Sequence, residues 1–309
     1  MAKYLVTGAA GFIGSHLAKK LADEGHEITI IDNLSTGNKK NIVWGGVQLY
    51  GDDFSPEIIA KLNNEKFDVI FHIAGQSSGE ISFENPIYDL NCNAASTLLL
   101  LDYAKRTGCK RFVYASSMSV YGDENKGSVS ELTAELKPKS FYAVGKIASE
   151  HYMRIYTQYG IRSTALRFNN TYGSGQNMEN LKQGMVSIFL AQAVKNHHIV
   201  VKGDKNRFRD FVHVDETVRA RIMAANGNET ELYNCYNVAT NIKTTCEELI
   251  ATIKNYLPFD VSVEYSGSTP GDQYGIYCDY SKIKQNLGWE PKISLNEGIK
   301  EMCHWALTL

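Results

Sequence analysis

The chain has 309 residues, of which 43% are hydrophobic and 21% charged, and its formal net charge at pH 7 is −2. This composition excludes a disordered chain and supplies enough apolar residues for a full core. The near-neutral charge argues against nucleic acid and anionic membranes as partners, because both select clusters of basic residues, and no apolar run reaches the roughly 18 residues of a membrane span.

The first half of the chain alternates short apolar runs with amphipathic stretches. Residues 3–7 read as a buried strand, residues 12–24 carry apolar side chains at helical spacing, and residues 27–31 form a second β-branched run. Strand, helix and strand in this order make the βαβ unit of a parallel sheet. The further expected strands are residues 47–50, 67–73, 110–116 and 162–168, and the further expected helices are residues 56–64, 86–107 and 141–159.

Beyond Gly173 the pattern loosens into shorter elements. The expected helices here are residues 184–196 and 244–256, and the expected strands are residues 199–201, 210–214 and 261–263. The sequence therefore predicts an α/β fold, a Rossmann-type doubly wound parallel sheet with a smaller C-terminal α/β substrate-binding lobe. Open sheets of this class bind ligands at the carboxyl ends of their strands.

The six cysteines are scattered, with no CxxC pair and no histidine at metal-ligand spacing. We expect a reduced, cytoplasmic protein without a metal site. The start of the chain runs directly into the first strand, so no signal peptide is expected either.

A glycine motif, Gly8-Ala9-Ala10-Gly11-Phe12-Ile13-Gly14, lies between the first strand and the first helix. Glycines at this turn let the backbone approach a pyrophosphate, which the helix N-terminus stabilises, although a tight strand-to-helix turn is the simpler interpretation. Asp32 ends the second strand, where a carboxylate accepts hydrogen bonds from an adenosine ribose and repels a 2′-phosphate. This favours NAD over NADP, and Lys39 and Lys40 keep NADP open.

Tyr142 and Lys146 are four residues apart on one face of an expected helix. A lysine ammonium beside a phenol lowers the pKa of the phenol, so Tyr142 is a candidate base towards a substrate hydroxyl, with an ordinary surface pair as the alternative. The hydroxyl-rich segment at residues 116–122 directly follows a predicted strand, where ligands bind. This context favours the catalytic interpretation.

With these motifs in order, the chain resembles the extended short-chain dehydrogenase/reductase family, and within it the nucleotide-sugar 4-epimerases. The resemblance covers essentially the whole chain. Besides the motifs above, it includes Gly51-Asp52, His72-Ile73-Ala74-Gly75, Asn93 with Ser96-Thr97, Arg167 with Asn170, Arg209-Asp210-Phe211-Val212-His213, Pro270-Gly271-Asp272 and Leu287-Gly288-Trp289.

The resemblance implies NAD as cofactor and assigns its contacts. The pyrophosphate would be held by Gly8, Gly11, Phe12, Ile13 and Gly14, the adenosine ribose by Asp32 and Asn33, and the adenine by Asp52 and Asp53. The nicotinamide side would be lined by Ala74, Gly75, Asn93, Tyr142 and Lys146. Residues 1–172 would form the NAD-binding domain with the catalytic residues, and residues 173–309 mainly the nucleotide-sugar lobe, with some segments returning to the first domain.

The implied catalytic residues are Ser117, Tyr142 and Lys146, and the implied substrate contacts are Ser117, Tyr142, Asn170, Arg209 and Asp272. The expected reaction is epimerisation at carbon 4 of a nucleotide-diphosphate hexose, most simply a UDP-sugar, through a transient 4-keto sugar. The alternatives are a one-way 4-keto-sugar oxidoreductase, a 4,6-dehydratase and, outside the enzymes, a dinucleotide sensor. Such sensors typically lose the Tyr and Lys that are present here.

Departures from the family pattern bear on these alternatives. Met118 and Ser119 stand where dehydrating relatives carry an acid pair, which ranks the dehydratase low. Gly145 replaces a usual Ser, and the second family arginine is missing before Pro270, so the nucleotide stays open. The helix around Ile87 to Tyr103 has a broad apolar face, and by resemblance we expect a homodimer there, with core burial as the alternative.

Overall fold

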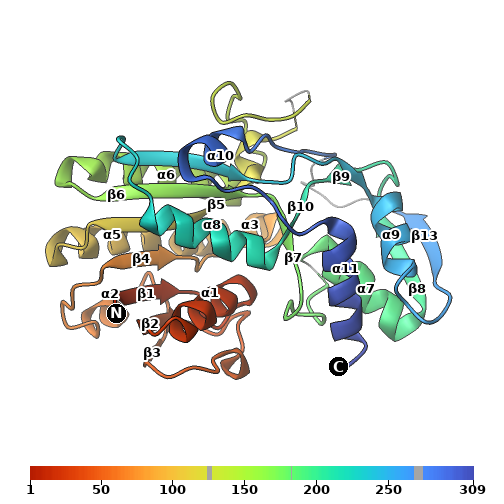
Figure 1. The fold of residues 1–309 in the computed structure, drawn as a ribbon, viewed down its shortest axis with the longest axis horizontal. Coiled ribbons are helices and arrows are strands. Elements are labelled where there is room, and N and C mark those ends of the chain that lie inside the picture. The colour runs from red at the N-terminus through yellow and green to blue at the C-terminus, as the bar shows by residue number, and fades with distance from the viewer. Residues whose placement is uncertain (124–126, 182, 268–273) are drawn as a thin grey trace. The chain divides into compact units, whose positions relative to one another are not determined.

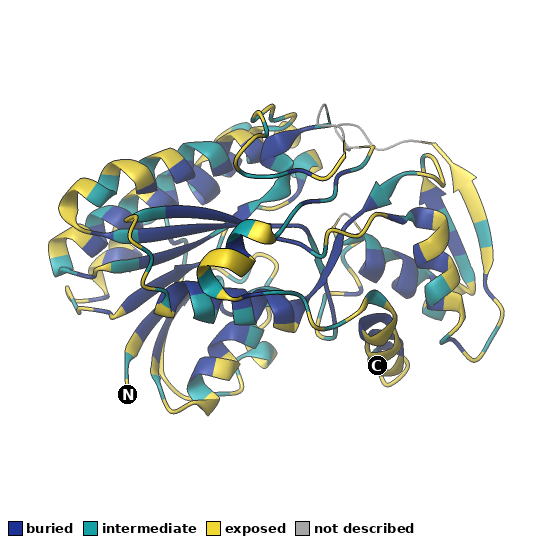
Figure 2. Ribbon diagram, turned by 45° about the horizontal axis from the view of Figure 1, so that its top comes forward, coloured by how far each residue is buried: buried dark blue, intermediate teal, exposed yellow. Residues whose placement is uncertain are grey.

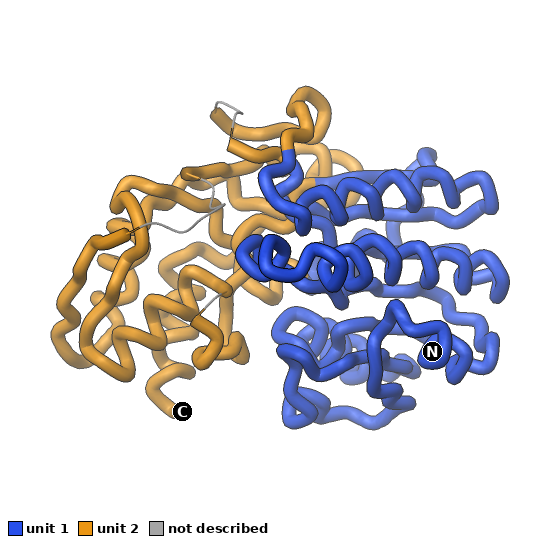
Figure 3. The backbone as a smooth tube through the Cα atoms, turned by 180° about the vertical axis from the view of Figure 1, so that it is seen from behind, with its two compact units in different colours: residues 1–120, 138–167, 218–236 blue, residues 121–137, 168–217, 237–309 orange. Residues whose placement is uncertain are grey.

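The computed structural model describes residues 1–123, 127–181, 183–267 and 274–309. These residues fall into two compact units (Figure 3): unit 1 comprises residues 1–120, 138–167 and 218–236, and unit 2 comprises residues 121–137, 168–217 and 237–309. The chain therefore passes between the units several times. One of these passages lies between residues 167 and 168, near the boundary at residues 172–173 that was expected together with segments returning to the first domain.

A seven-stranded sheet with the order β11-β6-β5-β4-β1-β2-β3 forms the centre of the fold (Figure 1). Its strands are β1 (Lys3–Thr7), β2 (Glu27–Asp32), β3 (Val47–Tyr50), β4 (Val69–His72), β5 (Arg111–Ser117), β6 (Arg162–Phe168) and β11 (Tyr233–Val238). The pairs β1–β2, β1–β4, β2–β3 and β4–β5 are parallel. The predicted Rossmann-type α/β fold is confirmed.

Helices flank this sheet, and their buried sides explain why the amphipathic stretches of the sequence fold as they do. They are α1 (Phe12–Asp23), α2 (Pro56–Ala60), α3 (Gly79–Glu84), α4 (Pro86–Leu90), α5 (Ser96–Thr107), α6 (Phe141–Tyr156) and α8 (Val214–Asn226). Apolar residues of α2, α5 and α6 form one cluster with Leu5 and Phe112 of the sheet. Six of the seven strands are accordingly buried along most of their length, whereas β3 at the sheet edge is mostly exposed (Figure 2).

The single helix expected over residues 86–107 is three consecutive pieces. Between α4 and α5 lies a π-helical turn, η2 (Asn91–Ala95). Such a turn inserts one residue into the helix and changes which side chains face inwards, and it is common at functional sites. Asn93, at the centre of the turn, is fully buried.

Unit 2 has a core of its own. Its strands are β7 (Asn170–Tyr172), β8 (His198–Lys202), β9 (Phe208–Arg209), β10 (Phe211–His213), β12 (Thr244–Thr245) and β13 (Ser262–Ser266), and its further helices are α7 (Met185–Asn196), α9 (Cys246–Lys254), α10 (Ser281–Leu287) and α11 (Leu295–Ala306). Apolar residues of α7, α9 and α11 pack together around Ile199 and Val201 of β8. The sequence patterns did not predict α3, α8, α10, α11, β7 or β11.

Candidate active site

The glycine turn follows β1 and brings backbone close to backbone. Gly8 has φ +72°, a left-handed conformation that favours glycine, and a Cβ at this position would lie 2.8 Å from the backbone nitrogen of Ala74. A Cβ on Gly14 would overlap the carbonyl oxygen of Gly8. The sequence motif thus forms a turn with no room for side chains at the N-terminus of α1, which is the arrangement that admits a pyrophosphate.

The predicted ribose and adenine residues lie together at the ends of β2 and β3. Asp32 accepts hydrogen bonds from the backbone N–H of Ala10 and of Leu34, both at 2.8 Å. Asn33 donates its side-chain amide to Asp52 Oδ1 at 2.7 Å. The carboxylate of Asp32 is therefore fixed against the glycine turn, and Asn33 and Asp52 are held as a pair beside it.

Asp53 differs from these neighbours because its carboxylate points into the protein. Its Oδ2 lies 3.5 Å from Nδ1 of the buried His72, and it accepts no hydrogen bond from any residue that the structure describes. Burial raises the pKa of Asp53 to about 7 and holds the pKa of His72 well below its usual value. Any contact of Asp53 with an adenine would have to come from its backbone.

The reacting side chains come from β5 and α6. Ser117 ends β5, and Tyr142 and Lys146 occupy the first turns of α6, which Ser140 caps by accepting a hydrogen bond from the backbone of Ala143. Tyr142 and Ser117 share a side-chain hydrogen bond. The structure thus brings together the three residues that the sequence motifs predicted as a catalytic group.

The electrostatics of this group differ from the expectation. Burial raises the pKa of Tyr142 to about 12, against the opposing effect of its hydrogen bond to Ser117, and burial lowers the pKa of Lys146 to about 8. The ammonium of Lys146 donates to the carbonyl of Ala115 at 2.9 Å and lies 5.5 Å from the centre of the Tyr142 ring. Desolvation dominates both groups, so the net pKa of Tyr142 is raised rather than lowered in the cofactor-free protein.

The side chains of Asn93 and Lys146 meet next to Gly75, just after the end of β4. A Cβ on Gly75 would lie 2.6 Å from Asn93 Oδ1 and 3.3 Å from Lys146 Nζ. Oδ1 of Asn93 is buried, and within the described part of the chain it has no hydrogen-bond partner. An unsatisfied acceptor and a cation beside a glycine fit the donor hydroxyls and the carboxamide of a nicotinamide nucleoside, so the residues present suit this cofactor.

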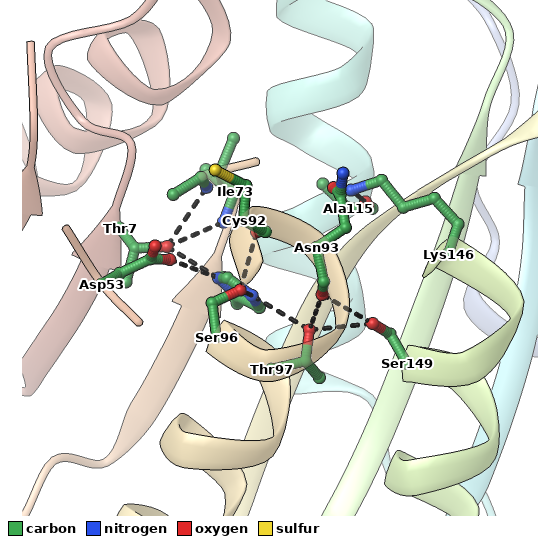
Figure 4. A network of polar contacts seen from close by, with 12 residues as sticks. Thr7, Asp53, Ile73, Cys92, Asn93, Ser96, Thr97, Ala115, Lys146 and Ser149 are labelled. Atoms are coloured by element: carbon green, nitrogen blue, oxygen red, sulfur yellow. Dashed lines mark hydrogen bonds and ion pairs between the residues drawn. The ribbon is translucent and has the colours of Figure 1, made fainter. Parts of the chain in front are cut away.

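A buried network of hydrogen bonds includes the backbone of Asn93 and fixes the segment that carries it (Figure 4). His72 shares hydrogen bonds with Thr7 at 2.8 Å and with Thr97 at 3.1 Å, and Ser149 donates to Thr97 at 3.0 Å and to the carbonyl of Asn93 at 2.8 Å. The network joins β1, β4, η2, α5 and α6. It fixes the strand ends and the π-helical turn that carry the site. The sequence motifs contained Thr97 and His72 but gave no sign that they meet.

Besides Ser117 and Tyr142, three substrate residues were predicted, and the two that the structure describes, Asn170 and Arg209, lie within unit 2. Asn170 begins β7, which pairs with β10, and its side-chain amide nitrogen is buried without a hydrogen-bond partner among the described residues. Arg209 is buried on β9 and donates to the carbonyls of Phe208 at 2.7 Å and Tyr274 at 3.2 Å. The third, Asp272, lies outside the described residues.

The described residues contain neither a metal-ligand cluster nor a helix that could span a membrane. No group of three or more His, Cys, Asp or Glu side chains among them is arranged to hold a metal ion. None of the helices that the structure describes is both long and apolar enough to cross a membrane.

Comparison with known proteins assigns the family. The model of the NAD dependent epimerase/dehydratase family matches residues 4–239. A protein named putative UDP-glucose 4-epimerase from Methanocaldococcus jannaschii is 36% identical over 303 residues, which are 97% of each chain. UDP-glucuronic acid decarboxylase 6 from Arabidopsis thaliana is 34% identical and covers 97% of this chain and 87% of its own.

A solved structure agrees with these relatives. UDP-glucose 4-epimerase from Thermotoga maritima, crystallised with UDP-glucose, superposes with a TM-score of 0.94 at 31% identity and covers 99% of both chains. The predicted family is confirmed, and with it NAD as the cofactor. The chain belongs to the NAD dependent epimerase/dehydratase family.

Proposed function

We propose that the protein is an NAD-dependent 4-epimerase of a nucleotide-diphosphate hexose, with a UDP-sugar as the first candidate substrate. One observation carries this proposal. Ser117, Tyr142 and Lys146 meet at the end of β5, while the two residues after Ser117 are Met118 and Ser119. This arrangement provides an acid/base group for a sugar hydroxyl and no carboxyl group directly after Ser117.

In the proposed reaction Tyr142 exchanges a proton with the 4-hydroxyl of the sugar. Ser117 donates a hydrogen bond to the same oxygen and holds it in place while the carbonyl forms and disappears. Bound NAD would supply the acceptor and donor of the carbon-4 hydride, and the positive charge of its oxidised ring would lower the pKa of a neighbouring phenol. In the cofactor-free protein the pKa of Tyr142 is about 12, so the phenol carries its proton near neutral pH.

The remaining roles follow the geometry. The glycine turn at residues 8–14 would hold the pyrophosphate, Asp32, Asn33 and Asp52 the adenosine, with Asp53 through its backbone, and Ala74, Gly75, Asn93 and Lys146 the nicotinamide nucleoside. Asn170, Arg209 and Asp272 would bind the sugar nucleotide. Residues 1–172 would thus serve mainly the cofactor and residues 173–309 mainly the substrate.

The relatives include dehydratases and decarboxylases, and the residues after Ser117 argue against dehydration. Loss of water from carbons 5 and 6 requires a base for the carbon-5 proton and an acid for the leaving hydroxyl. A thioether and an alcohol at Met118 and Ser119 supply neither near neutral pH. Ser119 instead donates to Ser117 Oγ at 3.0 Å, so it supports the hydroxyl that binds the reacting oxygen.

One experiment separates the reactions. We would incubate the purified protein in D₂O, without added cofactor, with UDP-, dTDP-, GDP- and CDP-hexoses and with UDP-glucuronic acid, and follow the sugar signals by proton NMR. A 4-epimerase gives the carbon-4 epimer with no deuterium at carbon 4, because the hydride returns without contacting solvent. Deuterium at carbon 5 with loss of the 6-hydroxyl would establish a dehydratase, and a pentose product a decarboxylase. A keto sugar formed only after NAD is added would establish the one-way oxidoreductase.

We also propose that the protein is a cytoplasmic homodimer. The described cysteines are all free and buried, which suits a reducing compartment. Phe83, Ile87, Leu90, Phe141 and Val144, on α3, α4 and α6 of unit 1, expose large apolar side chains. This area is the candidate dimer face. Light scattering would test it. We expect the mass of a dimer for the wild type and a larger share of monomer for Ile87→Glu.

A further inference from the structure

A buried carboxylate, Asp89, lies beside the nicotinamide side of the site and has no role in the account so far. It belongs to α4 and is 1% exposed. Its Oδ1 accepts hydrogen bonds from Gln76 Nε2 at 2.7 Å and from Asn93 Nδ2 at 3.1 Å. Burying a carboxylate is costly, so its retention here calls for a reason beyond packing.

The first effect of Asp89 is on the direction of the Asn93 amide. The nitrogen of this amide donates to Asp89 and, at 3.0 Å, to the carbonyl of Gln76. Both partners are acceptors, so they fix the nitrogen on their own side and turn Oδ1 towards Gly75. Asp89 therefore determines that the unsatisfied Oδ1 of Asn93 faces Gly75, where the nicotinamide nucleoside would bind.

The second effect is on the charge of Lys146. Desolvation acts against the ammonium, and the attraction of Asp89 is the largest of the effects that favour it. Helix α6 approaches closely here because residue 145 is a glycine: a Cβ on Gly145 would lie 3.1 Å from Cβ of Asn93 and 3.8 Å from Asp89 Oδ2. The glycine that departs from the family pattern thus leaves room for the Asp89 and Asn93 pair.

We propose that Asp89 is a positioning residue of the cofactor site, which orients the amide of Asn93 and keeps the ammonium of Lys146 protonated. The proposal rests on the proposed function for the use of Lys146 towards the cofactor. Its test measures cofactor binding alone, so it can succeed or fail whether or not a sugar is converted.

Other charged or titratable groups also act on Lys146, and they stay constant in the test. Asp53, Cys92 and Glu150 interact with it electrostatically, its ammonium also acts on His72, and the rings of Tyr114 and Tyr142 lie 4.7 Å and 5.5 Å from its Nζ. Because Asp53 has a pKa of about 7, its titration contributes to the wild type and to every variant alike.

The experiment is a titration of the cofactor-stripped protein with NADH, followed by fluorescence between about pH 6 and pH 9. Wild-type affinity is expected to fall as pH rises through about 8, where Lys146 loses its proton. Asp89→Asn keeps an acceptor for Asn93 and removes the charge, so its midpoint should lie about one pH unit lower, with affinity near pH 6 retained. Asp89→Ala removes both effects and should weaken NADH binding roughly tenfold at every pH.

The matched control is Asp23→Asn, which removes an exposed carboxylate of α1 that pairs only with Lys19 among its described contacts. It should reproduce the wild-type curve. Equal midpoints for the wild type and Asp89→Asn, or a wild-type affinity that does not change with pH, would overturn the proposal. If Asp89→Ala fails to fold, as its melting curve would show, the midpoint of Asp89→Asn alone decides.

Discussion

Asp53 in unit 1 and Asp210 in unit 2 are both buried carboxylates, and their surroundings are opposite. Oδ1 of Asp210 accepts hydrogen bonds from the backbone N–H and the hydroxyl of Thr240, at 2.9 Å and 2.6 Å, and Oδ2 accepts from the backbone of Asn241 at 3.0 Å. Oδ2 of Asp53 accepts no hydrogen bond from the described residues and lies 3.5 Å from Nδ1 of His72.

The comparison separates a structural carboxylate from one in a binding region. Burial raises the pKa of Asp210 to about 6, even though several hydrogen bonds favour its ionised form, and raises the pKa of Asp53 to about 7. Asp210 joins three segments of unit 2, because it accepts hydrogen bonds from Asn169, Thr240 and Cys278. Asp53, like Oδ1 of Asn93, is left incompletely satisfied near the predicted cofactor contacts of unit 1.

The largest effect is expected from closing the turn in unit 1. Gly8→Val places a side chain where a Cβ already meets Ala74 and where φ is +72°. We expect NADH affinity, measured by fluorescence, to fall at least about 100-fold. Gly25→Ala, at φ +82° with no atom within 4 Å, carries similar backbone strain without the clash and should bind NADH normally. Equal losses in both variants would assign the effect to strain.

The next largest effect tests the satisfied carboxylate. Asp210→Asn turns an NH₂ group towards backbone donors, so about 3 kcal/mol of unfolding free energy should be lost in urea denaturation. NADH affinity of the folded protein should not change. Asp260→Asn, an exposed position of the same unit, should match the wild type within about 0.5 kcal/mol. A loss at Asp210 no larger than this would remove the distinction between the two carboxylates.

The smallest effect is expected at Asp53, and it has the opposite sign. The folded-state pKa of about 7 exceeds the ordinary value of 3.8, so the native state binds more protons than the unfolded state between these values, and wild-type stability should fall as pH rises from about 4 to about 7. Asp53→Asn removes this dependence and should stabilise the protein by about 1–2 kcal/mol at pH 7. Urea denaturation across this pH range measures it, and a destabilised variant with the wild-type slope would refute the account.

The sequence predicted those parts of the fold and site that rest on local patterns. The βαβ unit, the glycine turn and the Tyr142 and Lys146 pair follow from residues close together in the chain, so periodicity and spacing were enough to find them. The π-helical turn at Asn91–Ala95 was missed because it stands inside an otherwise regular helical pattern.

The parts that were missed depend on partners distant in the sequence. β11 contains Asn234 and Asn237, which weaken a strand prediction, and Asn237 is buried because it bonds to Tyr121 at 2.7 Å and to the carbonyl of Val129 at 2.9 Å. Asp89 left a weak signal, since it precedes Asn93 by one helical turn. For α11 the sequence contains a clear helix signal that was missed, the capping box of Ser294 and Glu297.

Hydrogen exchange in NAD-free and NAD-loaded protein tests the central claim most directly, namely that the glycine turn and the unsatisfied Oδ1 of Asn93 belong to the cofactor site. We predict slower exchange on NAD binding in residues 8–14 and 91–95, which carry the glycine turn and Asn93, and no change at Thr240 and Asn241 around Asp210. Unchanged exchange in the glycine turn, or equal slowing around Asp210, would contradict the account.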